Sequence, residues 1–145
     1  MRTMSPPQVE KVLGALKTWS SRQPRVDALA LVGSWASSRD HAECDLEVVC
    51  VVDDPDKFQA EQDWIRQIDW SSTGLAVKGW TEVDFGGARA RHLTFDSGEE
   101  VEVNFVDRKW VSTEPVDPVT RRLAGEGLRV LHDPRGLLGK LLVAL

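Results

Sequence analysis

The spacing of hydrophobic residues predicts that the chain begins with a helix. After Ser5, apolar residues recur at helical intervals on one face, at Val9, Val12, Leu13, Leu16 and Trp19. Ser5 is placed to cap this helix, Pro6 suits its first turn, and Gln8 completes a capping-box spacing. Pro24 ends the helical pattern.

Two apolar runs that follow predict buried strands. Ala28 to Val32 is short and runs into the turn residues Gly33-Ser34. Cys44 to Val52 is apolar at nearly every position after its start, and Asp53-Asp54-Pro55 ends it. Apolar residues on both faces predict that the second strand lies centrally in a sheet.

The middle of the chain predicts one helix, one strand and one hairpin. Lys57 to Trp70 has helical spacing of Phe58, Ile65 and Ile68, and Leu75 to Phe85 is expected to be a strand. Arg89 to Val106 is expected to form a hairpin about Asp96-Ser97-Gly98.

The register of this hairpin follows from its polarity pattern, because a slip of one residue exchanges the two faces of a strand. A three-residue turn with Gly98 in a left-handed bulge places Phe95 opposite Glu99 and Leu93 opposite Val101. That register gathers the apolar residues on one face. It leaves the polar side chains on the other, at His92, Thr94, Glu100, Glu102 and Asn104.

The C-terminal part predicts two helices. The first is Val119 to Ala124, and the second is expected to start with Asp133 as cap and Pro134 in its first turn. Leu137, Leu138, Leu141 and Leu142 give this last helix an apolar face. The order of elements predicts an α+β fold in one domain over residues 1–145, with a mixed sheet covered by helices mainly on one face.

Composition narrows the classes of function. The net charge of −5 argues against broad nucleic-acid binding, although a single nucleotide needs only a local positive spot or a metal. No apolar run reaches the roughly 18 residues that span a bilayer, and Met1 to Gln8 lacks the apolar stretch of a secretory signal. Cys44 and Cys50 on one strand would lie about 20 Å apart, too far for a disulfide. We therefore expect a cytoplasmic protein that does not bind membranes.

The candidate chemistry lies around the two buried strands. Asp45 and Glu47 are two residues apart on a strand, so they share a face at the start of the second strand. Neighbouring carboxylates repel each other, and a divalent cation such as Mg²⁺ relieves that repulsion. Gly33-Ser34 permits close backbone approach to a phosphate, and Arg39 adds positive charge. The alternative is that the acids merely begin a strand and that Gly33-Ser34 is an ordinary turn.

Val32-Gly33-Ser34 and the run Asp45-Leu46-Glu47-Val48 resemble the signature of the nucleotidyltransferase superfamily. That superfamily includes DNA polymerase beta, the aminoglycoside and lincosamide nucleotidyltransferases, and the minimal nucleotidyltransferases of toxin–antitoxin pairs. Leu128 to Leu138 is also similar to antibiotic-modifying members, so the resemblance covers about residues 25 to 138. Two departures are Ser37-Ser38, where many members have a second glycine, and Glu47, where aspartate is commoner.

The resemblance implies a nucleotidyltransferase-type fold with its active site on the sheet face away from most of the helices. It implies that Asp45 and Glu47 hold Mg²⁺, as one ion or two, and that Gly33-Ser34 holds the triphosphate. It further implies a third carboxylate on a later strand, as a metal ligand and base for the acceptor hydroxyl. Glu102 is the candidate, and Glu100 and Asp84 are its competitors.

Other side chains near this region have more than one interpretation. His92 would lie opposite Glu102, as a catalytic partner or as a solvated strand residue. Arg89 and Arg91 are placed either to contact phosphates or to discourage strand pairing at a sheet edge. Trp35 would stack on a nucleotide base or contribute to packing.

Two functions remain as hypotheses. The first is a Mg²⁺-dependent enzyme that moves a nucleoside monophosphate, AMP from ATP by expectation, to a hydroxyl of a small molecule or a protein. The second is a weakly active or inactive binding module of the same fold, similar to an antitoxin-like partner protein. In either case we expect a homodimer or a helical protein partner to complete the site, because the chain is short.

Overall fold

A computed structural model of the chain describes residues 4–37, 46–85, 88–125 and 127–145. Its described strands form one sheet of six, in the order β3-β4-β5-β2-β1-β6. The strands are β1 (Val26–Val32), β2 (Leu46–Val52), β3 (Val77–Phe85), β4 (Ala88–Phe95), β5 (Glu100–Val106) and β6 (Leu128–His132). Strands β2 and β5 pair in parallel and the other neighbours pair antiparallel, so the sheet is mixed.

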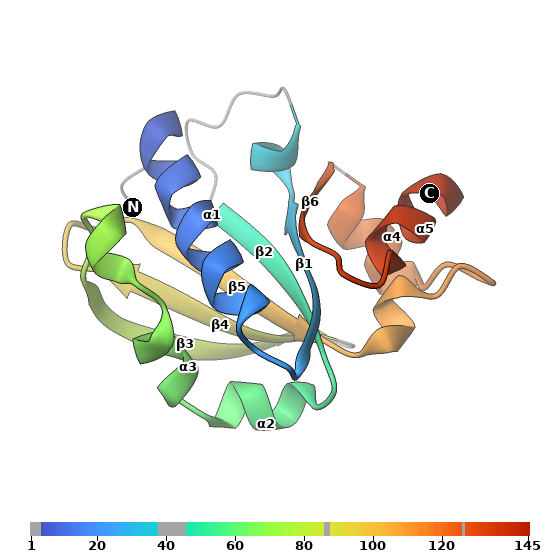
Figure 1. The fold of residues 1–145 in the computed structure, drawn as a ribbon, viewed down its shortest axis with the longest axis horizontal. Helices are drawn as coiled ribbons and strands as arrows, with labels where there is room; N and C mark the ends of the chain where they lie inside the picture. Colours follow the sequence, from blue (N-terminus) through green and yellow to red (C-terminus); the bar gives the residue numbers. More distant parts are fainter. Residues whose placement is uncertain (1–3, 38–45, 86–87, 126) are drawn as a thin grey trace.

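The helices lie in two groups, one on each face of this sheet (Figure 1). The first group is α1 (Pro6–Ser21), α2 (Pro55–Ala60) and α3 (Asp63–Gln67), and the second is α4 (Pro118–Ala124) and α5 (Leu137–Ala144). Three 3₁₀ turns accompany them in the described residues: η1 (Ser34–Ala36), η2 (Trp70–Thr73) and η3 (Arg108–Val111). The α+β fold class predicted from the order of elements is confirmed.

The larger core lies between the sheet and α1, α2 and α3. Alternate residues of the strands, such as Leu46, Val48 and Cys50 on β2, point into it together with one face of α1. Trp19 and Trp64 meet there with ring centroids 5.9 Å apart. Burial on this face accounts for the helical and alternating patterns of the N-terminal half.

The second face is covered over only part of its width. Residues of β1 and β2, including Ala30, Val32 and Val49, pack against α5 and η3 in a smaller core. Figure 1 shows α4 and α5 gathered beyond β1 and β6, away from β3 and β4. The C-terminal helices therefore leave the part of this face that lies over β5, β4 and β3 to polar side chains.

Local signals at the first helix and at the hairpin are confirmed. Ser5 accepts a hydrogen bond from the backbone N–H of Gln8 at the start of α1. In the hairpin, Leu93 pairs with Val101, and the N–H of Phe95 donates to the carbonyl of Glu99. Gly98 has a φ of 96°, the left-handed conformation that the three-residue turn requires.

The single helix predicted over Lys57 to Trp70 is wrong. The chain forms α2 and α3 instead, and between them Glu61 has an extended backbone, with φ −79° and ψ 148°. The indole N–H of Trp64 donates to the carbonyl of Phe58 at 3.0 Å, which occupies a carbonyl near the end of α2. Breaking the helix lets Phe58 and Trp64 both pack on Phe105. The ring of Phe58 is stacked on it at 5.2 Å between centroids, and that of Trp64 meets it edge-on at 5.1 Å.

The predicted start of the last helix is also wrong, and Gly136, not Asp133, occupies its N-cap position. Helix α5 begins at Leu137 after Gly136, which has a φ of 69°, so Pro134 lies in the preceding turn. The carboxylate of Asp133 accepts from the backbone N–H groups of Leu138 and Gly139 at 3.1 and 3.0 Å. Asp133 thus caps the helix from outside its first turn.

Strand β6 has no counterpart in the sequence predictions. Its burial pattern is half-exposed at Leu128, exposed at Arg129 and Val130, and buried at Leu131, so no regular alternation marks it. It is an edge strand that pairs with β1 alone. Across the described residues, no helix is long and apolar enough to cross a membrane. Cys50 is a buried free thiol, and Cys44 lies outside the described residues.

Candidate active site

The turn at the end of β1 forms one border of the candidate site. Gly33 has φ 80° and ψ −159°, a conformation open essentially to glycine alone. Its carbonyl accepts from the N–H of Ala36 at 3.0 Å, and the carbonyl of Ser34 accepts from the N–H of Ser37 at 3.1 Å. The sequence pair Gly33-Ser34 therefore forms a defined tight turn, in which Ser34 is buried.

Glu47 and Glu102 lie side by side on adjacent strands. They are paired in the parallel ladder between β2 and β5, so their side chains share one face about 5 Å apart at the backbone. Both are half-buried. A Cβ built on Gly33 would lie 3.6 Å from Oε2 of Glu47, so the turn backbone comes close to this carboxylate.

These residues belong to a single row that crosses the whole sheet. Reading from β3, pairing joins Thr81 to His92, His92 to Glu102, Glu102 to Glu47, Glu47 to Val32, and Val32 to Leu128. The β1–β6 half of the row is apolar and packs with the C-terminal helices. The β3–β2 half is polar, and Glu47 stands at the boundary between the two halves.

The remaining residues of the predicted metal and phosphate site lie outside the described residues. Asp45 and Arg39 fall within residues 38–45, so the description of the site does not include them. Among the residues that the structure does describe, no group of three or more His, Cys, Asp or Glu side chains is placed to hold a metal ion. Of the three predicted metal ligands, the structure describes Glu47 and Glu102.

His92 and Glu100 form a second polar pair next to Glu102. Nε2 of His92 lies 3.6 Å from Oε2 of Glu100, and the two side chains are 27% and 25% exposed. Glu100 is therefore in contact with His92 at the open face of β4 and β5. Asp84, the other competitor of Glu102, belongs to strand β3 opposite Arg89 in register.

Both interpretations of Arg89 and Arg91 are wrong. Strand β4 lies inside the sheet, so neither arginine guards an edge. Arg91 is fully buried on the α1 face, where its Nη2 donates to Oε1 of Glu82 at 2.9 Å. Nε of Arg89 donates to the carboxylate of Asp56 at 2.7 Å. Both arginines pair with acids away from the face that carries Glu47 and Glu102.

Trp35 also lies away from that face. It is half-buried and packs against the larger core on the α1 side of the sheet. Together with Leu31, Val9 and Pro6 it lines a shallow groove of about 420 Å³. This position gives no support to base stacking by Trp35 beside Glu47.

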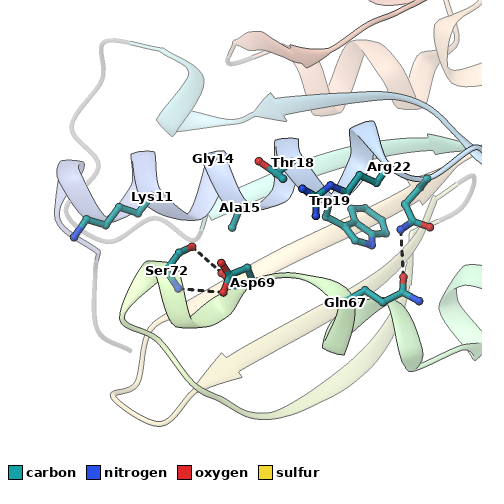
Figure 2. Close-up of a pocket in the computed structure, with 10 residues that line it drawn as sticks. Lys11, Gly14, Ala15, Thr18, Trp19, Arg22, Gln67, Asp69 and Ser72 are labelled. Carbon is teal, nitrogen blue, oxygen red and sulfur yellow. Dashed lines mark hydrogen bonds between the residues drawn. The ribbon is translucent and has the colours of Figure 1, made fainter.

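A further hollow lies between α1 and η2 and is separate from the candidate site (Figure 2). Its volume is about 410 Å³, and Lys11, Thr18, Trp19 and Asp69 are among its lining residues. The side chains of Gln23 and Gln67 are joined by a hydrogen bond of 3.3 Å at one end. Because α1 and η2 cover the other face of the sheet, this hollow contains none of the predicted site residues.

Several solved structures are similar to this chain in fold. A crystal structure of an aminoglycoside 6-adenyltransferase from Bacillus subtilis aligns with a TM-score of 0.49 at 11% sequence identity. The alignment covers 74% of this chain and 37% of that protein, so this chain spans little more than a third of its length. No protein-family model matches the chain, and no curated protein sequence matches it.

Two residues near the site were not found from the sequence. Asn104 is fully buried on the same face as Glu102, and its Nδ2 donates to the carbonyl of Val48 at 3.1 Å. Gly127 approaches the turn after Gly33 from β6. Neither has a local sequence signal, because each depends on pairing between strands that are distant in the chain.

Proposed function

We propose that this protein is a Mg²⁺-dependent nucleotidyltransferase that transfers a nucleoside monophosphate, AMP from ATP, to a hydroxyl group. The observation that carries the proposal is the pairing of Glu47 with Glu102 beside the backbone of Gly33. Carboxylates from two strands next to a glycine turn suit a cation that binds a polyphosphate at the same time.

The donor chemistry of the site fits a hard divalent cation. Glu47 and Glu102 offer oxygen ligands, which Mg²⁺ prefers, and both retain access to solvent. Like charges at paired positions destabilise a sheet, and a cation between them removes that cost. In this proposal Asp45, Glu47 and Glu102 hold the metal, whose chemistry is to neutralise charge on the triphosphate.

The turn at Gly33 and Ser34 is proposed to hold the triphosphate. The left-handed glycine keeps the backbone free of a side chain where it passes the carboxylate of Glu47. A phosphate group can therefore approach the main chain closely, which a larger residue would prevent. Arg39 follows this turn in the chain and is proposed to add positive charge.

Glu102 is proposed to act as the base for the acceptor. The acceptor oxygen attacks the α-phosphorus, a new oxygen–phosphorus bond forms, and the bond to the bridging oxygen breaks to release pyrophosphate. The hydroxyl proton passes to the carboxylate of Glu102. The position of Glu102 between Glu47 and the polar surface of β4 supports this proposed role.

The acceptor is proposed to approach over β4 and β3. The C-terminal helices occupy the β1 and β2 part of this face, whereas Thr81, His92 and Thr94 line the part beyond Glu102. Hydroxyl, imidazole and carboxylate groups on that surface suit an acceptor rich in hydrogen-bonding groups, either a small molecule or a protein side chain.

Calorimetric titration with a non-hydrolysable ATP analogue tests this proposal. Binding is expected in the presence of Mg²⁺, with loss on chelation and at least a tenfold weakening, as an order of magnitude, in Asp45→Asn. Asp96→Asn is the matched control, because it makes the same change at an exposed position in the hairpin turn. An affinity for the ATP analogue that changes neither on removal of Mg²⁺ nor in Asp45→Asn would exclude the proposed site.

A transfer assay with α-labelled ATP separates the enzyme from a binding module of the same fold. Label on an added hydroxyl acceptor, together with release of pyrophosphate, is the expected result. Metal-dependent binding without transfer to any acceptor, combined with a stable complex with a helical protein partner, would favour the binding module instead.

A further inference from the structure

The start of strand β6 lies directly across from the glycine turn of the candidate site. In the antiparallel ladder between β1 and β6, Leu31 pairs with Arg129 and Val32 pairs with Leu128. Gly33 directly follows Val32, and Gly127 directly precedes Leu128. A glycine therefore stands just beyond the last pair of the ladder on each side, at the point where β1 enters the turn.

Gly127 comes closer to this turn than a side chain would allow. A Cβ at position 127 would lie 3.0 Å from both the carbonyl carbon and the oxygen of Ala36, and 3.2 Å from the nitrogen of Ser37. All three atoms belong to the main chain, so no flexible side chain can move aside. Gly127 also has a φ of 151°, which disfavours other residues.

The segment that Gly127 contacts belongs to the same turn as Gly33 and Ser34. The N–H of Ala36 donates to the carbonyl of Gly33, and both the N–H and the Oγ of Ser37 donate to the carbonyl of Ser34. These bonds make residues 33 to 37 one connected unit. The unit has the carboxylate of Glu47 on one side and the backbone of Gly127 on the other.

We propose that Gly127 is a positioning residue for the triphosphate-binding turn: by contacting Ala36 and Ser37 through its bare backbone, it sets where Gly33 and Ser34 lie relative to Glu47. This inference rests on the proposed function for its role in nucleotide binding. The contact of Gly127 with Ala36 and Ser37 is shown by the distances given above and does not depend on that function. A side chain at position 127 would press on the main chain of the turn, which must give by a few tenths of an ångström, and the phosphate site would shift with it.

Gly127→Ala tests the inference against Gly74→Ala as a matched control. Gly74 also has a left-handed φ, of 76°, but a Cβ there would meet nothing within 4 Å. Both substitutions place alanine at a positive φ, and only Gly127→Ala adds a contact with another segment. We expect Gly127→Ala to raise the Kd for Mg²⁺ and the ATP analogue about tenfold or more, with less than a twofold change in Gly74→Ala. Equal Kd values in Gly127→Ala and the unsubstituted protein would overturn the inference.

Hydrogen exchange at single amides gives a readout that does not need nucleotide. The N–H groups of Ala36 and Ser37 are expected to exchange at least tenfold faster in Gly127→Ala than in Gly74→Ala. If the unsubstituted protein binds no nucleotide but this acceleration is seen, the proposed function fails while the positioning contact stands. Unchanged exchange at both amides would overturn the contact.

The unsubstituted protein provides a measurement that does not depend on the variant folding. Addition of Mg²⁺ and the ATP analogue is expected to slow exchange at Ala36, Ser37 and Gly127 together, because the turn and Gly127 move as one unit. The N–H of Gly74, which donates to the carbonyl of Ser71, is expected to stay unchanged. Slowing at the turn without slowing at Gly127 would count against the inference.

Discussion

Glu47 on β2 and Glu102 on β5 occupy paired positions in the only parallel ladder of the described sheet, although 54 residues separate them in the chain. Their side chains share the face that the C-terminal helices leave open. The turn backbone of Gly33 lies next to Glu47, and His92 lies next to Glu102. Because these residues lie at different places around the pair, we expect their substitutions to change different measured properties.

Glu102→Gln is expected to lower the rate of transfer by about 10²–10⁴-fold, because a glutamine cannot accept the acceptor proton. Glu100→Gln, a change of the same kind two residues away on the same face, is expected to lower it less than about tenfold. Steady-state release of pyrophosphate measures both. A larger loss in Glu100→Gln would transfer the role of third acid to Glu100.

Gly33→Ala is expected to weaken binding of the Mg²⁺–nucleotide complex, because alanine is strained at a φ of 80° and its Cβ would lie against the Glu47 carboxylate. The free energy of unfolding should fall by about 1–3 kcal/mol from the backbone strain. Gly14→Ala, in the middle of α1 with nothing within 4 Å of the new Cβ, is the control. That control should raise the free energy of unfolding by roughly 0.5–1 kcal/mol. Urea unfolding measures the change in the free energy of unfolding, and calorimetry measures the change in nucleotide binding.

Phe105→Ala is expected to lower the free energy of unfolding by about 3–5 kcal/mol, because a fully buried ring is lost from the larger core. Phe58 and Trp64 both pack on this ring, so the cavity cannot close without moving α2 and α3. Val143→Ala, at a side chain that is 89% exposed, should change the free energy by less than about 0.5 kcal/mol. A small effect of Phe105→Ala would show that this core is loosely packed.

Cys50 is expected to resist thiol reagents in the folded protein. Burial raises the pKa of the Cys50 thiol well above its ordinary value, and the negative charge of Asp27 adds to the shift. In a Cys44→Ser background, reaction with a disulfide reagent at pH 8 should proceed only as fast as unfolding exposes the thiol. Rapid reaction of the folded protein would contradict the burial of β2.

The same thiol predicts how stability depends on alkaline pH. The folded protein keeps the proton that the unfolded chain releases near pH 8.5, so the contribution of Cys50 is complete below that pH. As pH rises above 8.5 the unfolded state ionises and the free energy of unfolding falls. Cys50→Ala should show a shallower fall between pH 8.5 and 10 in urea unfolding. Parallel pH profiles for the two proteins would contradict the assignment.

Local patterns predicted the elements whose signals lie within a few residues. The cap at Ser5, the hairpin register about Gly98 and the central position of β2 all follow from neighbouring residues. The errors occur where distant contacts decide. The helix predicted over Lys57 to Trp70 is broken where Phe58 and Trp64 both pack on Phe105, which comes from a distant part of the chain.

The candidate site divides in the same way. Asp45, Glu47 and Gly33-Ser34 form a motif within a short stretch of chain, so sequence alone was sufficient to single them out. The face that Glu102 occupies also follows from alternation along its strand. Arg91 could not be placed correctly, because its burial beside Glu82 depends on β4 lying inside the sheet.

The sequence by itself determined which side chains share a face of each strand, because alternation and turn residues act over a few positions along the chain. Only the tertiary structure decided that β5 lies parallel to β2, that Glu102 therefore meets Glu47, and that β6 brings Gly127 against the turn of Gly33. Several strands have similar apolar patterns, so the local sequence does not determine which strand pairs with which. Their order is set by packing of the whole chain, in which all faces must be buried at once.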